Sequence, residues 1–391
     1  MLRYFTAGES HGEALVAFLS GLPAGLNIDQ SFVDRELWRR QQGYGRGGRM
    51  KIEADKAHFL SGVRHGKTIG SPISVVIENR DWQNWQESLP VEPGDPEKHR
   101  RVESPRPGHA DLAGALKYNF AEARYVLERS SARESAARVA IGALAKIFLR
   151  ELGVEVLSHV IAVGSVSVGE REILWEQIEP LARKDDVLLS CADADAEQRM
   201  KEEVDKVLRT GDSAGGVFEV VAHNVPPGLG SYVQWDERLD GMLAAAVMSL
   251  QAVKAVEIGS GIAAAHAPGS AVHDEIGYQR NAGFAGFTRT RNNAGGIEGG
   301  VSNGQEIRVR GYLKPISTLR RPLQSVDFAS REPVKAAYER SDVCVVPAAG
   351  VAGEAMVALT LARCALEKFG GDSIEETKRN FEGYLEQLRK Y

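Results

Sequence analysis

Ser-Pro-Arg-Pro-Gly-His-Ala-Asp at residues 104–111, followed by Arg-Ser-Ser-Ala-Arg-Glu at 129–134 and an apolar run to Gly153, carries the clearest structural signal in the chain. Ser131 precedes Glu134 by three residues, which is the capping-box pattern of a helix start. Residues 139–145 are apolar or glycine on every face, so we expect a helix that is buried nearly all round. Gly153 would end this helix.

The start of the expected helix is crowded with hydroxyl and guanidinium groups, which are those of Arg129, Ser130, Ser131 and Arg133. A helix N-terminus already offers free N–H groups and the positive end of a dipole. With these side chains added, the segment is a candidate anion site, most simply for a phosphate. The alternative is an ordinary capped helix with solvated arginines.

Composition limits the possible classes of protein. The 391 residues suffice for one large domain or two ordinary ones, and we find no repeat and no obvious linker. A net charge of −5 provides no basic field for nucleic acid. No signal peptide and no run of about 18 apolar residues is evident, so we expect no membrane span. Three scattered cysteines fit a reducing cytosol and predict no metal site; they are Cys191, Cys344 and Cys364.

A helix is expected over residues 28–42, followed by a loop rich in arginine and glycine. Gly43, Gly45 and Gly48 have dinucleotide-binding spacing, but that motif must follow a strand and open a helix, so we reject it. A mobile loop that closes over a polyanion is the preferred interpretation, and a solvated basic loop is the alternative. The arginines concerned are Arg40, Arg46 and Arg49.

Two histidines are candidates for proton transfer near neutral pH. His11 lies between glycines at the end of a strand expected over residues 4–7, and His109 follows Pro107-Gly108. A turn histidine and a buried structural histidine are the respective alternatives.

The second half of the chain adds further candidates. A second buried helix is expected over residues 240–257, carrying Gln251 and Lys254. The glycine-rich segment 292–304 has backbone N–H groups that could cradle a ring system or a phosphate. Asp342 follows Arg340 closely, as in a structural ion pair or a held base. Charged helices are expected at 172–186, 194–210 and 373–390, and strands at 71–79, 154–168, 215–223 and 306–313.

Together these motifs closely resemble chorismate synthase, in order from the N-terminus to about residue 370. The matching segments are 8–12, 39–47, 106–111, 129–134, 293–300 and 314–318. The resemblance implies an α/β (α+β) fold in which a single domain over 1–391 forms a sandwich of antiparallel β-sheets around a helical core layer, assembled as a homotetramer in the cytoplasm. It implies conversion of 5-enolpyruvylshikimate 3-phosphate to chorismate and phosphate by a 1,4-elimination that requires reduced FMN.

The resemblance also implies roles for residues. His11 would protonate or stabilise the departing phosphate, His109 would keep the reduced flavin correctly protonated at N1, and Asp342 would help the N5 region accept the substrate hydrogen. Arg40, Arg46 and Arg49 would bind substrate or NADP anions. The implied flavin contacts are Arg129, Ser130, Ser131, Ala132, Arg133, Gln251, Ala252, Gly299, Lys314, Pro315, Ile316, Ser317, Thr318 and Arg340.

Two other classes of protein remain. A flavin-dependent oxidoreductase using the same pocket would turn over NADPH without the phosphate ester. A non-catalytic phosphate or nucleic-acid binder would show salt-dependent oligonucleotide affinity. Some chorismate synthases also reduce their own flavin with NADPH, and the sequence leaves open whether this chain does.

Overall fold

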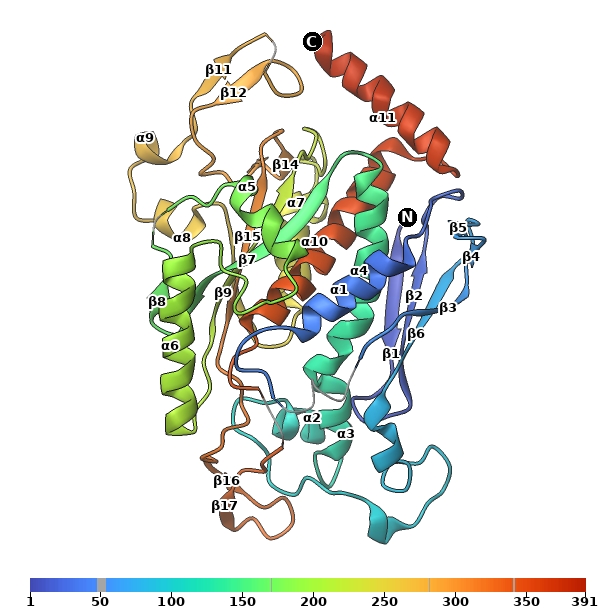
Figure 1. The fold of residues 1–391 in the computed structure, drawn as a ribbon, viewed down its shortest axis with the longest axis vertical. Helices are drawn as coiled ribbons and strands as arrows, with labels where there is room; N and C mark the ends of the chain where they lie inside the picture. Colours follow the sequence, from blue (N-terminus) through green and yellow to red (C-terminus); the bar gives the residue numbers. More distant parts are fainter. Residues whose placement is uncertain (48–53, 170, 281, 340–341) are drawn as a thin grey trace.

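Two antiparallel sheets enclose a layer of helices (Figure 1). The computed structural model describes residues 1–47, 54–169, 171–280, 282–339 and 342–391. The first sheet has the order β1 (Arg3–Ala7), β2 (Ala14–Ser20), β6 (Ile73–Glu78) and β3 (His58–Ser61). The second has the order β10 (Val253–Ile258), β15 (Ile307–Leu313), β9 (Gly216–His223), β7 (Glu155–Val163) and β8 (Val166–Ser167). This arrangement confirms the predicted sandwich.

The helical layer consists of α1 (Gln30–Gln41), α4 (Ser135–Arg150) and α10 (Val346–Phe369). Helix α4 is buried along its length from residue 135 to 149 except at Arg138, as predicted. Its start differs from the prediction. Ser131 closes α3 (Arg124–Ser130) and caps a 3-10 turn, and its N–H is bonded to the Leu127 carbonyl. The side chain of Glu134 therefore bonds to Thr6 instead of completing a capping box.

The sequence analysis did not predict α10, which is the longest helix among the described residues. By length and composition it could cross a membrane, but 83% of its apolar window is buried within the structure. Its glycines allow this burial. A β-carbon at Gly353 would lie 2.6 Å from the Phe218 ring of β9, so only glycine lets this helix approach the second sheet.

The prediction of a helix over residues 240–257 is correct only for its first half. Helix α7 spans Leu239–Met248, and β10 follows. Between them Ala252 adopts a left-handed φ of 69°, which ends any helix, and β10 then pairs with β15. Gln251 therefore lies in a turn and Lys254 on a strand.

The charged helix expected over 172–186 is also shorter than predicted. It consists of α5 (Trp175–Ile178) and a 3-10 turn (Glu179–Arg183), because Pro180, the second residue of the turn, has no backbone N–H to continue the helix.

Other predictions are confirmed. Helix α6 spans Ala194–Thr210, and α11 (Ile374–Arg389) begins where the Ser373 hydroxyl accepts the Glu376 N–H at 3.2 Å. The remaining elements are small and lie in the connections: β4 (Val63–Arg64), β5 (Lys67–Thr68), α2 (Asp111–Tyr118), α8 (Gly261–Ala264), α9 (Gly269–Val272), β11 (Ile276–Tyr278), β12 (Phe287–Arg289), β13 (Ile297–Glu298), β14 (Val301–Ser302), β16 (Gln324–Val326) and β17 (Pro333–Lys335).

Helices α4 and α10 cross with almost no space between their backbones. A β-carbon on Gly142 of α4 would lie 2.3 Å from the β-carbon of Ala355 on α10. No rotamer change can relieve such a contact, because neither atom belongs to a flexible side chain.

We therefore expect Gly142→Ala to lower the free energy of unfolding by about 1–3 kcal/mol, the usual cost of overpacking a core. Helix propensity alone would change stability in the opposite direction, because it favours alanine over glycine by about 1 kcal/mol. Urea denaturation followed by circular dichroism would measure the change. Gly383 on α11 is the matched control, because no atom lies within 4 Å of where its β-carbon would be. Gly383→Ala should leave stability unchanged or raise it, and equal behaviour of the two variants would contradict the close crossing.

Candidate active site

His11 lies in the turn between β1 and β2, and Glu128 of α3 holds it at two points. The Glu128 carboxylate accepts the backbone N–H of His11 at 2.7 Å and contacts its ring Nδ1 at 2.9 Å. The imidazole also packs against Trp85, with the ring centroids 4.1 Å apart. Trp85 comes from the segment 81–99, which follows β6. This segment therefore contributes a buried aromatic side chain to the site.

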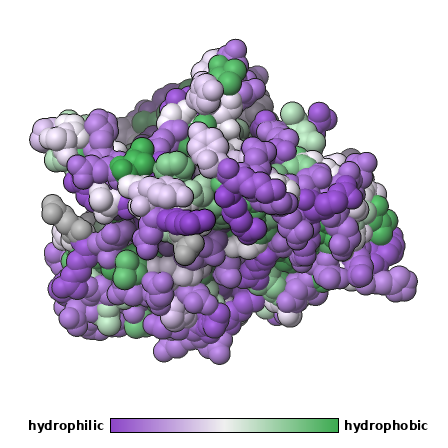
Figure 2. Space-filling view, turned by 90° about the horizontal axis from the view of Figure 1, so that it is seen from above, coloured by the Kyte–Doolittle hydropathy of each residue, from purple (hydrophilic) through white to green (hydrophobic). Residues whose placement is uncertain are grey.

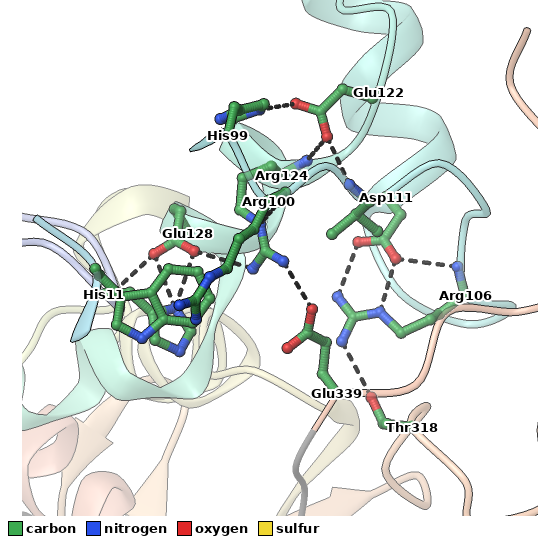
Figure 3. Close-up of polar contacts among 12 residues, drawn as sticks. His11, His99, Arg100, Arg106, Asp111, Glu122, Arg124, Glu128, Thr318 and Glu339 are labelled. Atoms are coloured by element: carbon green, nitrogen blue, oxygen red, sulfur yellow. Dashed lines mark hydrogen bonds and ion pairs between the residues drawn. The ribbon is translucent and has the colours of Figure 1, made fainter. Parts of the chain in front are cut away.

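A chain of charges extends from His11 into the protein (Figure 3). Arg124 lies between Glu128 and Glu339, with its Nη1 3.4 Å from Glu128 Oε1 and its Nη2 2.8 Å from Glu339 Oε1. Burial alone would raise the pKa of Glu128, but the hydrogen bonds and charge of His11, with Arg124, hold that pKa below its usual value. Glu128 is therefore a carboxylate at neutral pH.

His109 belongs to a second, separate pair with a carboxylate. Its Nδ1 lies 2.5 Å from Asp111 Oδ1 at the start of α2, and Arg106 contacts the same carboxylate with its Nε at 2.8 Å. Burial would raise the pKa of Asp111, but the hydrogen bonds and charges of His109 and Arg106 hold it well below its usual range. Arg106 Nη1 also donates to the Thr318 hydroxyl at 3.0 Å, so His109 and the segment 314–318 lie in one cluster.

The segment 314–318 is fixed against its neighbours at several points. The Lys314 N–H donates to the carbonyl of Ala252 at 3.0 Å, and the Ser213 hydroxyl donates to the carbonyl of Ile316 at 2.7 Å. Lys314 Nζ lies 3.4 Å from the Ser317 hydroxyl. Burial and the nearby charge of Lys254 lower the pKa of Lys314. Pro315 lies within this same segment.

Gly108 lies beside this segment, and its φ of 78° favours glycine. A β-carbon there would lie 3.8 Å from Lys314 Nζ and 3.9 Å from Ser317 Cβ, which is ordinary contact distance. By contrast, Gly299 lies in the turn of the β13–β14 hairpin, and nothing would contact a side chain there within 4 Å.

Glu134 joins α4 to the end of β1 and to the turn before β10. It accepts hydrogen bonds from Thr6 at 2.6 Å and from Gln251 at 3.1 Å. Arg129, which is 44% exposed, donates to the carbonyl of Thr6 at 2.8 Å. The Ser130 hydroxyl is buried and has no hydrogen-bond partner among the described residues. Ala132 continues this segment, and its carbonyl accepts from Arg40 at 2.9 Å.

Arg40 and Arg46, which were predicted in one mobile loop, and Arg133, which was predicted at a helix start, lie close together in the structure. Arg133 is 2% exposed and contacts both carboxylate oxygens of Asp55 at 2.7 Å. Arg40 lies on α1, donates to the Ser135 hydroxyl at 2.9 Å and reaches Asp55 only at 3.5 Å. The expectation that Arg40 belongs to a mobile loop is therefore wrong, because the last turn of α1 buries it.

Asp342 pairs with Arg46 at 2.9 Å and accepts the Gly47 N–H at 2.5 Å. This cluster therefore holds three arginines against two carboxylates among the residues described. Burial lowers the pKa of Arg40 to about 10. The charge of Asp55 acts against this shift, and the charges of Arg133 and Arg46 add to it. Arg49 and Arg340, which the sequence also predicted as site residues, lie outside the described residues.

Sequence reasoning missed four residues that shape the site: Trp85, Asp55, Arg124 and Glu128. Glu128 directly precedes the Arg-Ser-Ser motif, and this position was its only signal. Asp55 carried no signal, because its partner Arg133 is 78 residues away in sequence.

Comparisons with known proteins agree with the motifs. The family model described as chorismate synthase matches residues 2–366. The chorismate synthase of Koribacter versatilis (strain Ellin345) is 74% identical over 100% of both chains, and that of Acidobacterium capsulatum is 69% identical over 100% of both. A solved structure titled "Crystal Structure of Chorismate Synthase" matches with a TM-score of 0.78 and 41% identity, covering 100% of this chain and 99% of the other.

Removal of Arg133 would leave the buried carboxylate of Asp55 without its main partner. We expect Arg133→Ala to lower the free energy of unfolding by about 3 kcal/mol, the scale of a broken buried ion pair. Denaturation at pH 7 would measure it. Arg129→Ala is the matched control, since this arginine is 44% exposed and its loss should cost under about 1 kcal/mol. A loss in Arg133→Ala no larger than in the control would show that the Asp55 pair contributes little to stability.

Proposed function

This chain belongs to the chorismate synthase family, and on that premise we propose that it converts 5-enolpyruvylshikimate 3-phosphate to chorismate and phosphate by a 1,4-elimination that requires reduced FMN. Chorismate synthases are phosphate-eliminating carbon–oxygen lyases of the shikimate pathway, and this chain is one of them. The substrate, the flavin and the residue roles given below are the proposed part.

The single observation that carries the proposal is the buried cluster of Arg40, Arg46 and Arg133. Among the described residues three guanidinium groups share two carboxylates there, and Arg40 Nη1 is buried without a hydrogen-bond acceptor among them. A phosphate or carboxylate oxygen would supply that acceptor. Arg49 and Arg340 are proposed to extend the same anion site, either for the substrate or for NADP.

The residues around His109 fit a flavin. Bound reduced FMN would lend electron density to the breaking C–O bond and recover it. Gly108, Lys314 and Ser317 lie together beside His109, and the buried Ser130 hydroxyl offers a hydrogen-bonding group. The proposed contacts are those of Arg129, Ser130, Ser131, Ala132, Arg133, Gln251, Ala252, Gly299, Lys314, Pro315, Ile316, Ser317, Thr318 and Arg340.

Three residues are proposed to handle protons. His11, held by Glu128, donates its proton toward the departing phosphate. His109, whose Nδ1 contacts Asp111, is proposed to keep the flavin N1 region correctly protonated. Asp342, fixed by Arg46 and the Gly47 N–H, assists at the N5 region, where the substrate hydrogen leaves.

We also propose that residues 1–391 form one domain, because a single hydrophobic cluster includes residues from Leu2 to Phe381. A homotetramer in the cytoplasm is part of the same proposal. Phe5 and Phe18 are paired in register on the first sheet and are 73% and 45% exposed, which supports a subunit contact there. Figure 2 shows another face of the molecule, on which hydrophobic residues are scattered among hydrophilic ones.

The decisive assay is anaerobic phosphate release from 5-enolpyruvylshikimate 3-phosphate, with and without photoreduced FMN and without NADPH. We expect release only with reduced flavin, together with chorismate absorbance. His11→Ala and His109→Ala should each lower kcat by about 10²- to 10⁴-fold, the usual scale for general acid–base residues.

His58→Ala, which removes an exposed histidine on β3, is the control and should retain full activity. NADPH oxidation without the phosphate ester would favour the oxidoreductase alternative. NADPH added with oxidised FMN would then show whether the enzyme reduces its own flavin. Folded protein that releases no phosphate under any of these conditions would refute the proposed reaction.

A further inference from the structure

We infer that Glu128 is a positioning residue for His11, which fixes the ring so that Nδ1 carries a proton toward the carboxylate and Nε2 is the nitrogen that exchanges a proton with the reacting groups. The inference rests on the proposed role of His11. It extends the site to a residue that does not itself touch the substrate.

The geometry is unusual in that one residue fixes both the backbone and the ring of His11. The Glu128 carboxylate accepts the His11 N–H at 2.7 Å through Oε2 and contacts ring Nδ1 at 2.9 Å through Oε1. The carbonyl of Glu128 also accepts the Ser10 N–H at 2.9 Å. Three contacts from one residue therefore determine where the Ser10–His11 turn lies and how the imidazole is rotated.

The protonation of Nδ1 follows from the chemistry of Glu128. An ionised carboxylate only accepts hydrogen bonds, so the ring nitrogen that faces it must carry a hydrogen. The low pKa of Glu128 agrees with this charge state. Since Nδ1 keeps its hydrogen in both charge states of the ring, gain and loss of a proton occur at Nε2.

The surroundings prevent Glu128 and His11 from reorienting. Glu128 is 2% exposed at its side chain, and Arg124, 3% exposed, holds it from the other side. Arg124 is itself fixed, because its Nε donates to the Arg100 carbonyl at 2.6 Å. The guanidinium groups of Arg124 and Arg100 lie 5.1 Å and 4.5 Å from the Trp85 ring centroid, and Trp85 packs on His11.

A second buried histidine–glutamate pair offers a matched control. His159 Nε2 lies 3.1 Å from Glu219 Oε2, and both side chains are at most 3% exposed. This pair lies on β7 and β9 of the five-stranded sheet, whereas His11 follows β1 of the other sheet. A substitution of Glu219 therefore tests the general cost of disturbing a buried His–Glu pair.

The test is Glu128→Gln in the full chain, assayed with reduced FMN and 5-enolpyruvylshikimate 3-phosphate. We expect kcat to fall about 10- to 100-fold, by analogy with carboxylates that orient metal-bound histidines, while KM changes less than about 2-fold. Without substrate, ¹⁵N spectra of histidine-labelled protein should show the His11 ring change tautomer, with the signal assigned by its absence in His11→Ala. Glu219→Gln should leave kcat and the His11 signal unchanged.

Wild-type kcat or an unchanged His11 tautomer in folded Glu128→Gln would overturn the inference. If that variant does not fold, Glu128→Ala removes the carboxylate that faces Nδ1 and should show both changes in the same direction; neither change would likewise overturn the inference. Because the ¹⁵N measurement needs no turnover, it tests Glu128 even if wild-type protein releases no phosphate, an outcome that would refute the proposed reaction alone.

Discussion

The buried carboxylate of Glu354 is the interaction on which the helical layer depends. Glu354 lies on α10 and forms ion pairs with Arg39 of α1, at 2.7 Å, and with Lys146 of α4. It also accepts hydrogen bonds from the N–H and the hydroxyl of Ser158 on β7. A buried charge is tolerated only when its partners are complete, so the three helices and the second sheet must meet in one register. Arg40 follows Arg39 directly, and the same constraint therefore places an arginine of the proposed anion site.

The close crossing of α4 and α10 also fixes the position of the residues that precede α4. With Gly142 against Ala355, α4 cannot slide along α10, so the segment before α4 is fixed in space. That segment carries Arg133 and Glu134, which join the buried arginine cluster and the contacts of Thr6 and Gln251. The chemistry of the site is thus positioned by helix packing that takes place in an apolar core.

Sequence patterns correctly predicted those helices whose formation depends mainly on neighbouring residues in the chain. Helix α6 and the cap of α11 follow from periodicity and from Ser373, and the burial of α4 follows from its uniform apolar faces. The end of α7 could not be predicted, because the left-handed φ of Ala252 reflects the pairing of β10 with β15. The sandwich architecture came from the family resemblance and not from periodicity. Motifs identified His11, but Glu128 is 117 residues away and only the tertiary fold brings it close.

A histidine paired with a carboxylate does not by itself mark a catalytic group in this protein. His159 and Glu219 form such a pair with the His159 side chain fully buried, where no ligand can reach it. His11 and His109 differ because their side chains are 11% and 20% exposed, beside arginines and a lysine that favour anions. Because Glu219 also pairs with two arginines, Arg308 and Arg310, what distinguishes the two histidines of the proposed site from His159 is their exposure. The carboxylate fixes the ring, and the surroundings determine whether the fixed ring has anything to protonate.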